Sequence, residues 1–205
     1  VEKIVNLNWE NIHPPPKGTG KGSYLTAVTE VDNKIVEIID VEKILSEVSP
    51  MQEDVPESLI REETVQSASA RELAVLIADD SSVARKQIKR CVEKLGVKTH
   101  LVADGRQALE HLRELVDKGE SITDHYVMLI SDIEMPEMDG YTLTASIKED
   151  PRMKGLHILL HTSLSGIFNE AMVKRVGADD FLAKFKPDRL AELVQGQITR
   201  ALSEH

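Results

Sequence analysis

The chain has 205 residues, of which 41% are hydrophobic, which is enough for one domain of ordinary size and part of a second. Its 25 basic and 35 acidic residues give a net charge of -10, which argues against a broad basic surface for nucleic acid. No apolar run approaches the ~18 residues that span a bilayer, and the single cysteine, Cys91, cannot form an internal disulfide, so we expect a cytoplasmic protein without direct membrane insertion.

The first 72 residues contain two stretches of different composition. The run YLTAVTEVDNKIVEIID at 24–40 predicts two β-strands around a turn at Asp32 and Asn33, and the loop HPPPKGTGKGS at 13–23 precedes it. The segment 46–72 has two arginines and seven acidic residues, a net charge of -5, together with two prolines and a serine cluster. This composition predicts an exposed acidic linker with room for a short helix.

From Leu73 onward, apolar runs of strand length alternate with segments of helix length. The runs are LAVLIA at 73–78, THLVA at 99–103, YVMLIS at 126–131, HILLHT at 157–162 and DFLA at 180–183. This alternation predicts an α/β domain with a five-stranded parallel sheet covered by helices on both faces. In such sheets a ligand binds beyond the carboxyl ends of the strands, where the strand order reverses.

Carboxylates follow two of the predicted strands. Asp79 and Asp80 come after the first strand, and Asp132 comes after the third, which neighbours the first in a flavodoxin-like sheet. Three carboxylates at one edge repel one another unless a cation lies among them, and oxygen ligands with room for water favour Mg²⁺. Taken alone, however, an acidic pair before a helix is more often an N-cap.

Two further side chains are predicted at the same edge of the sheet. Thr162 ends the fourth strand, and Lys184 follows the fifth. An aspartate nucleophile, a metal ion, a hydroxyl donor and an ammonium group are what transfer of a phosphoryl group to a carboxylate requires. Together these positions favour phosphoryl chemistry over a simple helix cap.

Residues 73–205 resemble a response-regulator receiver domain. The resemblance depends on the acidic pair, on MPEMDG shortly after Asp132, on Thr162 and on GADDFLAK, which ends at Lys184. It implies a flavodoxin-like (βα)5 fold and a phospho-accepting regulatory protein that is not an enzyme. One departure from the receiver pattern is Phe185, which follows Lys184 where receivers usually have proline.

The receiver resemblance also implies roles for individual residues. Asp132 is the implied phosphoacceptor, and Lys184 is implied to contact the phosphoryl group. The switch residues are implied to be Thr162 and Phe181. The implied Mg²⁺ site consists of Asp79, Asp80, Asp132 and the backbone carbonyl of Glu134, with Asp80 as a direct ligand and Asp79 acting mainly through metal-bound water.

Residues 1–45 resemble the carboxyl-terminal part of a CheW-like coupling domain, through NWENIHPPPKGTG and SYLTAVTEVDNKIVEIIDVEKIL. A coupling domain, an acidic linker at 46–72 and a receiver at 73–205 form the arrangement of CheV-type chemotaxis coupling proteins. The resemblance implies a signal-transduction adaptor that binds chemoreceptors and a CheA-type histidine kinase, with the kinase as phosphoryl donor.

Two other function classes use part of this pattern. An aspartyl-nucleophile phosphatase of haloacid-dehalogenase-like type also needs an aspartate, Mg²⁺ and a lysine, but its acidic pair lies late in the chain and it has a substrate cap domain. Here Asp79 and Asp80 precede Asp132. One further feature that matches that family is Glu134, which lies two residues after Asp132, where the family has a second acid. A transcription factor with a receiver needs a basic recognition module, which this sequence does not offer.

Overall fold

The computed structural model describes residues 9–16, 24–39, 44, 55, 60–162, 167–184 and 186–203. The chain forms two compact units, Val1–Gln52 and Glu53–His205. Among the described residues, none of the helices combines the length and the apolar content needed to cross a membrane.

The first unit contains a short 3-10 helix, η1 (Trp9–Asn11), and an antiparallel hairpin of β1 (Leu25–Val31) and β2 (Lys34–Ile39). The turn residues Asp32 and Asn33 have φ angles of 52° and 58°, as a two-residue hairpin turn requires, which confirms the predicted turn. The loop before β1 is attached to the hairpin, because His13 and Val28 exchange two backbone hydrogen bonds of 2.8 and 2.9 Å.

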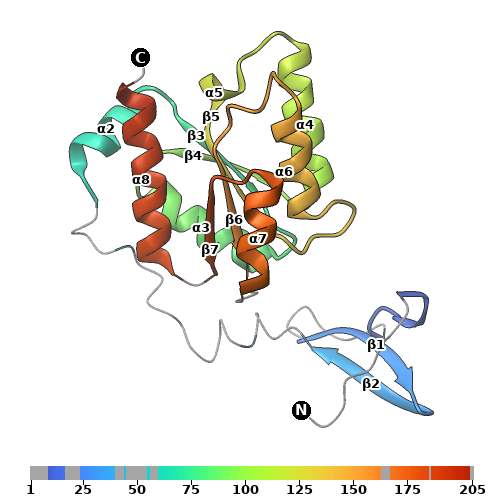
Figure 1. The fold of residues 1–205 in the computed structure, drawn as a ribbon. Coiled ribbons are helices and arrows are strands. Elements are labelled where there is room, and N and C mark those ends of the chain that lie inside the picture. The colour runs from blue at the N-terminus through green and yellow to red at the C-terminus, as the bar shows by residue number, and fades with distance from the viewer. Residues whose placement is uncertain are drawn as a thin grey trace. The chain divides into compact units, whose positions relative to one another are not determined.

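The second unit is built on a five-stranded parallel sheet (Figure 1). Its strands are β3 (Ala74–Ala78), β4 (Lys98–Val102), β5 (Tyr126–Ser131), β6 (Ile158–Thr162) and β7 (Asp180–Ala183). The strand order is β4-β3-β5-β6-β7, so the order reverses at β3. The predicted flavodoxin-like parallel sheet is therefore confirmed.

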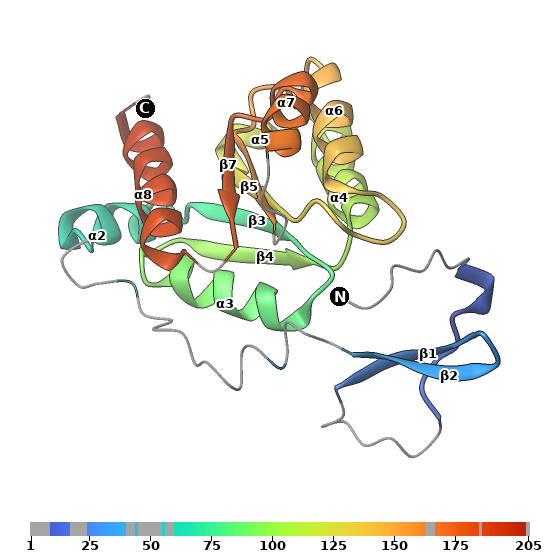
Figure 2. The same ribbon diagram turned by 60° about the horizontal axis from the view of Figure 1, so that its bottom comes forward.

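Helices cover both faces of this sheet (Figures 1 and 2). They are α2 (Glu62–Ala70), α3 (Ser82–Glu93), α4 (Gly105–Asp117), α5 (Ile122–His125), α6 (Gly140–Glu149), α7 (Ile167–Val176) and α8 (Pro187–Ser203). Successive residues of β3 point to opposite faces: Val75 and Ile77 join the core with α3 and α8, whereas Leu76 and Ala78 join the core with α4 and α6. Burial on both faces explains why the strands read as continuous apolar runs.

Helix α2 lies inside the segment 46–72, for which the composition predicts an exposed linker. Its Ala68 is fully buried in the core that α3 and α8 share, and Ile60 packs against the same core. The acidic residues of the helix, for example Glu62 and Glu63, are exposed to solvent. The acidic composition of the segment therefore does not reveal that the other face of the helix is packed. Residues 60–72 are thus part of the second unit, although the predicted domain limits at 45 and 73 stay predictions.

Candidate functional site

The sheet register brings the three predicted carboxylates together. Ala78 of β3 pairs with Ser131 of β5, so the residues that follow, Asp79 and Asp132, leave neighbouring strands at the same edge. The backbone N–H of Asp132 also donates to the Ala78 carbonyl at 2.8 Å. One carboxylate oxygen from each of Asp79, Asp80 and Asp132 lies within 4.8 Å of the other two. The parallel sheet therefore produces the cluster that the sequence pattern predicts.

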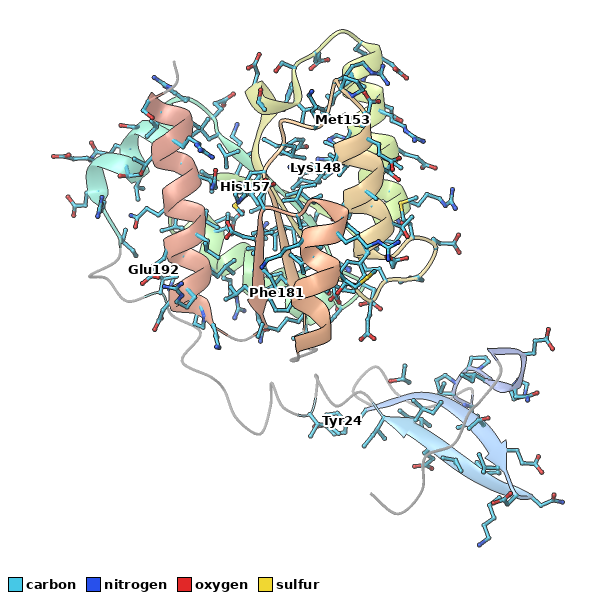
Figure 3. The ribbon with its side chains drawn as sticks, in the orientation of Figure 1. Tyr24, Lys148, Met153, His157, Phe181 and Glu192 are labelled. Atoms are coloured by element: carbon cyan, nitrogen blue, oxygen red, sulfur yellow. The ribbon has the colours of Figure 1, made fainter. Side chains whose placement is uncertain are left out.

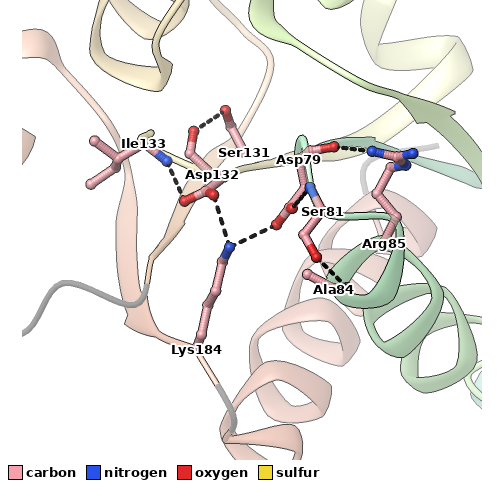
Figure 4. Close-up of polar contacts among 8 residues, drawn as sticks. All are labelled: Asp79, Ser81, Ala84, Arg85, Ser131, Asp132, Ile133 and Lys184. Carbon is pink, nitrogen blue, oxygen red and sulfur yellow. Dashed lines mark hydrogen bonds and ion pairs between the residues drawn. The ribbon is translucent and has the colours of Figure 1, made fainter. Parts of the chain in front are cut away.

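Lys184, which follows β7, lies between two of these carboxylates (Figure 4). Its Nζ is 2.8 Å from Asp132 Oδ2 and 3.0 Å from Asp79 Oδ2. The side chains of Lys184 and Asp79 are 2% and 0% exposed, so the ion pairs are shielded from water. Only the contact to Asp132 has good hydrogen-bond geometry, which leaves Asp79 Oδ2 without a well-aligned donor among the described residues.

The backbone holds the other carboxylate oxygens in place. Asp79 Oδ1 accepts a hydrogen bond from the N–H of Ser81 at 2.9 Å, and Asp132 Oδ1 accepts one from the N–H of Ile133 at 2.7 Å. Both carboxylates are therefore fixed by the loops that directly follow their strands. Such short local bonds set the orientation of an acidic side chain at little cost in chain entropy.

Burial is the largest cause that raises the pKa of Asp79, Lys184 acts in the opposite direction, and the nearby Asp132 carboxylate adds to the increase, which gives a pKa of about 6. The pKa of Asp80 is raised as well, first by burial and then by Asp132. Three carboxylates with one lysine thus form a site that is short of positive charge. Such a site favours a bound cation.

The donor set fits a hard divalent cation. All three side chains offer oxygen, Asp79 Oδ2 lacks a well-aligned hydrogen-bond donor among the described residues, and Asp80 is exposed so that water can complete a coordination shell. Oxygen ligands with retained waters are what Mg²⁺ prefers. The residues present are therefore suitable for Mg²⁺.

The acidic pair is not the helix cap. The N-cap of α3 is Ser81, whose Oγ accepts from the N–H of Ala84 at 3.3 Å. Arg85, one turn into the helix, donates from Nη1 to the backbone carbonyl of Asp79 (Figure 4). Neither role was predicted from the sequence, although a serine after the acidic pair is a usual capping signal. With Ser81 as the cap, the side chains of Asp79 and Asp80 remain available to the site.

Gly140 is a second important residue of the site that was not predicted from the sequence. A Cβ atom at Gly140 would lie 2.1 Å from the backbone oxygen of Asp132, a distance that no side chain tolerates. The Gly140 N–H donates to the Ile133 carbonyl at 2.9 Å, and Asp139 caps α6 by accepting from the N–H of Thr142 at 2.9 Å. The glycine of MDG thus lets α6 approach the loop that carries Asp132.

The remaining predicted residues lie around this cluster. Thr162 is fully buried at the end of β6, and its carbonyl accepts from the N–H of Lys184 at 2.8 Å. Phe181 of β7, labelled in Figure 3, is half-buried and packs against a small core of Ile133, Leu160 and Val173. The side chain of Glu134 is exposed.

The roles predicted for these residues stay predictions. Phe185, the departure from the receiver pattern, lies outside the described residues.

Family models match both parts of the chain. The model of the response regulator receiver domain matches residues 75–195, and the model of the CheW-like domain matches residues 1–49. Chemotaxis protein CheV1 of Helicobacter pylori is 31% identical over 198 residues, which cover 95% of this chain and 60% of the relative. Chemotaxis protein CheV2 of the same organism is 30% identical over 189 residues, which cover 90% of this chain and 57% of the relative. The chain thus spans less than two thirds of the length of these relatives.

Solved structures resemble the second unit. One is the receiver domain of the sensor histidine kinase PA1611 from Pseudomonas aeruginosa, which has a magnesium ion coordinated in its active-site cleft. It is 26% identical, with a TM-score of 0.53, and the match covers 62% of this chain and 97% of that chain. The chain therefore belongs to the response-regulator receiver family, and its CheW-like segment ahead of the receiver gives it the predicted domain combination of CheV-type chemotaxis proteins.

Proposed function

We propose that this chain is a cytoplasmic chemotaxis signal-transduction adaptor of CheV type. Its receiver accepts a phosphoryl group on Asp132 from a CheA-type histidine kinase, and its CheW-like part couples that kinase to chemoreceptors. The observation that carries the proposal is the buried Lys184, which bridges Asp79 and Asp132 beside Thr162 at the carboxyl edge of the sheet. This constellation has the parts that phosphorylation of a carboxylate needs.

The proposed transfer uses one carboxylate oxygen of Asp132 as the nucleophile. A bond forms between that oxygen and phosphorus while the bond from phosphorus to the imidazole nitrogen of the kinase breaks, and the electron pair leaves with the imidazole. Lys184 already holds Asp132 Oδ2 at 2.8 Å, so its ammonium group is in place to donate to a phosphoryl oxygen. The Thr162 hydroxyl supplies a second donor on the same side.

Asp79, Asp80, Asp132 and the backbone carbonyl of Glu134 are the proposed Mg²⁺ ligands. When bound, Mg²⁺ offsets the negative charge of the carboxylates and of the phosphoryl oxygens. The receiver structure of PA1611, with magnesium in its cleft, supports this assignment by similarity. The hydrogen bonds from the N–H groups of Ser81 and Ile133 keep the carboxylates oriented toward one shared position.

Phosphorylation is proposed to act as a switch. A phosphoryl dianion on Asp132 gives Thr162 and Lys184 a new hydrogen-bond acceptor and draws their loops inward. Phe181 packs against Leu160 of the strand that ends at Thr162, so space released there is available to its ring. NMR spectra with beryllofluoride, a mimic of the phosphoryl group, should show Phe181 changing environment. Shifts confined to residues that touch the ligand would reject the switch.

The proposal describes a regulatory phosphoacceptor that dephosphorylates itself slowly at most. A haloacid-dehalogenase-like phosphatase would instead hydrolyse small phosphate esters with many turnovers. Incubation with Mg²⁺ and p-nitrophenyl phosphate separates the two classes, because the phosphoacceptor should release no more than a trace of product.

Transfer of radiolabel from a phosphorylated CheA-type kinase tests the proposal. The chain should take up label only with Mg²⁺ present, and Asp132→Asn should remove the uptake because it removes the nucleophile and keeps the shape. The matched control is Asp117→Asn, which loses an exposed carboxylate paired with Arg152 and should leave uptake unchanged. Normal labelling of Asp132→Asn would overturn the assignment.

Binding of Mg²⁺ can be measured separately from phosphorylation by calorimetry. Asp80→Ala should weaken Mg²⁺ binding strongly, since it removes one of three ligand side chains, while the Asp117→Asn control should bind normally. An unchanged affinity in Asp80→Ala would remove Asp80 from the ligand set.

A further inference from the structure

Arg85 reaches from helix α3 back to the backbone of the acidic pair. Its Nη1 donates to the backbone carbonyl of Asp79, which belongs to the peptide bond between Asp79 and Asp80 (Figure 4). The N–H of Arg85 donates to the Ser81 carbonyl at 3.0 Å, so the residue lies in the first turn of the helix that Ser81 caps. The partner of the guanidinium is thus a peptide group and not a carboxylate.

The peptide bond that Arg85 holds lies where the chain leaves the sheet. The preceding peptide is still part of the sheet, because the N–H of Asp79 donates to the Val102 carbonyl at 3.3 Å. Strand β3 has ended before the next peptide, and the carbonyl of the fully buried Asp79 needs a donor from elsewhere. The guanidinium of Arg85 is that donor, and its charge makes the hydrogen bond a strong one.

The other side of the same peptide carries an N–H that interacts with the Asp80 carboxylate. Burial is the largest cause that raises the pKa of Asp80, and the backbone N–H groups of Asp80 and Ser81 are among the groups that lower it. Because a peptide group is planar, its carbonyl and its N–H are oriented as one unit. A donor that fixes the Asp79 carbonyl therefore also fixes the N–H that interacts with the carboxylate of Asp80.

Two cations hold Asp79 from opposite sides. Lys184 approaches its carboxylate, with Nζ 3.0 Å from Oδ2, whereas Arg85 approaches its backbone carbonyl (Figure 4). Lys184 also contacts Asp132 Oδ2, so both of its contacts use carboxylate oxygens. Arg85 adds a permanent positive charge beside the acidic pair and leaves the carboxylate oxygens available to a metal ion.

We propose that Arg85 is a positioning residue of the Mg²⁺ site, which holds the peptide between Asp79 and Asp80 so that the Asp80 carboxylate faces the site. This role rests on the proposed function, because it assumes that Asp80 binds Mg²⁺. One oxygen of Asp80 already lies within 4.8 Å of oxygens of Asp79 and Asp132. Groups that orient the ligands of a metal ion typically contribute about 10- to 100-fold to its affinity.

Calorimetric Mg²⁺ titrations of three variants test this role. Arg85→Met keeps the aliphatic stem and loses the donor and the charge, so its dissociation constant for Mg²⁺ should rise about 10- to 100-fold. Arg85→Lys keeps a charged donor and should recover most of the loss. Lys86→Met, the matched control, removes an exposed charge from the neighbouring position of the same helix and should bind Mg²⁺ like the wild type. Normal affinity in Arg85→Met, or an equal loss in Lys86→Met, would overturn the positioning role.

NMR spectra recorded without Mg²⁺ give a readout that does not depend on the metal. In Arg85→Met the amide signals of Asp80 and Ser81 should shift, because their peptide groups lose a fixed orientation, while that of Leu76 in the sheet should stay in place. Arg85→Lys should shift the same two amides less, and it gives the same test if the methionine variant does not fold. Unchanged signals of Asp80 and Ser81, or equal shifts throughout β3, would contradict a local positioning role.

Transfer of label from the kinase separates this inference from the proposed function. Arg85→Met should need more Mg²⁺ for half-maximal labelling and reach the wild-type level at saturation, because the nucleophile Asp132 is unchanged. Labelling that stays low at saturating Mg²⁺ would mean that Arg85 acts on the transfer itself, and would overturn the positioning role. A chain whose Mg²⁺ affinity depends on Arg85 but which takes up no label would refute the phosphoacceptor and leave the positioning role intact. A wild-type chain that binds no Mg²⁺ would refute both.

Discussion

Strands β2 and β3 are both rich in aliphatic residues, yet they have opposite environments. In β3, Val75, Leu76 and Ile77 are all 0% exposed. In β2, Ile35 and Ile39 are 80% and 49% exposed. Helices cover both faces of β3, whereas β2 has β1 as its partner strand among the described residues. An apolar run thus predicts a strand, while the elements packed around it decide whether the strand is buried.

The largest expected difference between these strands is in amide hydrogen exchange. The amides of β3 and β5 should exchange only through global unfolding, which for a domain costs ~5–15 kcal/mol. A two-stranded hairpin is marginal by itself, so β1 and β2 should exchange ~10³-fold faster or more. Mass spectrometry of timed exchange samples gives both values in one experiment. Equal protection of the two regions would mean that the hairpin is as stable as the receiver sheet.

The same substitution of isoleucine by alanine, made once in β3 and once in β2, measures the difference between the two strands as a free energy of unfolding. Ile77→Ala removes fully buried carbon from β3 and should lower the stability of the second unit by about 2–5 kcal/mol. Ile35→Ala makes the same change at an exposed position and should stay within about 0.5 kcal/mol. Urea unfolding followed by circular dichroism provides the values. Similar costs at the two positions would mean that Ile35 is covered in solution.

Two acidic residues of the second unit differ in pKa because their surroundings differ. Burial raises the pKa of Asp79 to about 6, whereas hydrogen bonds from Arg152 lower the pKa of the half-buried Asp150 to about 2. Because the pKa of Asp79 is higher in the folded state, its contribution to stability is complete below its ordinary pKa of 3.8 and is lost as the pH rises through about 6. Burial of His161 lowers the pKa of its imidazole to about 3 and acts in the opposite direction, adding stability as the pH rises toward 6.5.

The pH dependence of stability in the Asp79→Asn variant should therefore show the contribution of His161 without the opposing contribution of Asp79. Without Mg²⁺, the variant should gain about 2 kcal/mol more stability than the wild-type chain between pH 4 and pH 7, because the pKa of Asp79 rises from 3.8 to about 6 on folding and most of this difference titrates in that range. Urea unfolding across this pH range measures the two curves, with Asp117→Asn as the exposed control. Parallel curves for Asp79→Asn and the wild type would contradict a raised pKa at Asp79.

The smallest effect concerns residues with positive φ angles. The hairpin turn uses Asp32 and Asn33, which tolerate this conformation, whereas the end of α2 uses Glu72 with φ of 55°. Glu72→Gly should stabilise the second unit by roughly 1 kcal/mol relative to Glu72→Ala, because both lose the ion pair with Lys98 and only glycine relieves the backbone. Thermal unfolding of the two variants shows which of them is more stable. A glycine variant no more stable than the alanine variant would show that Glu72 is unstrained.

The architecture of the second unit could be predicted from its sequence. Strands that are buried on both faces must be apolar throughout, so runs such as those at 73–78 and 126–131 stand out without any knowledge of the fold. The carboxyl ends of parallel strands meet at one edge, so the positions of Asp79, Asp132 and Lys184 after their strands were enough to place them together. The turn at Asp32 and Asn33 was predictable because its signal is local.

Which surfaces face one another could be seen only in the folded structure. The packing of α2 depends on Gly96 and Ala201, which lie far along the chain, so a composition that predicts an exposed linker could not reveal it. The need for glycine at Gly140 arises from the backbone of Asp132, and the exposure of Ile35 arises from what does not cover it among the described residues. Each of these features depends on how the chain is arranged in space, and local propensity carries no information about distance in space.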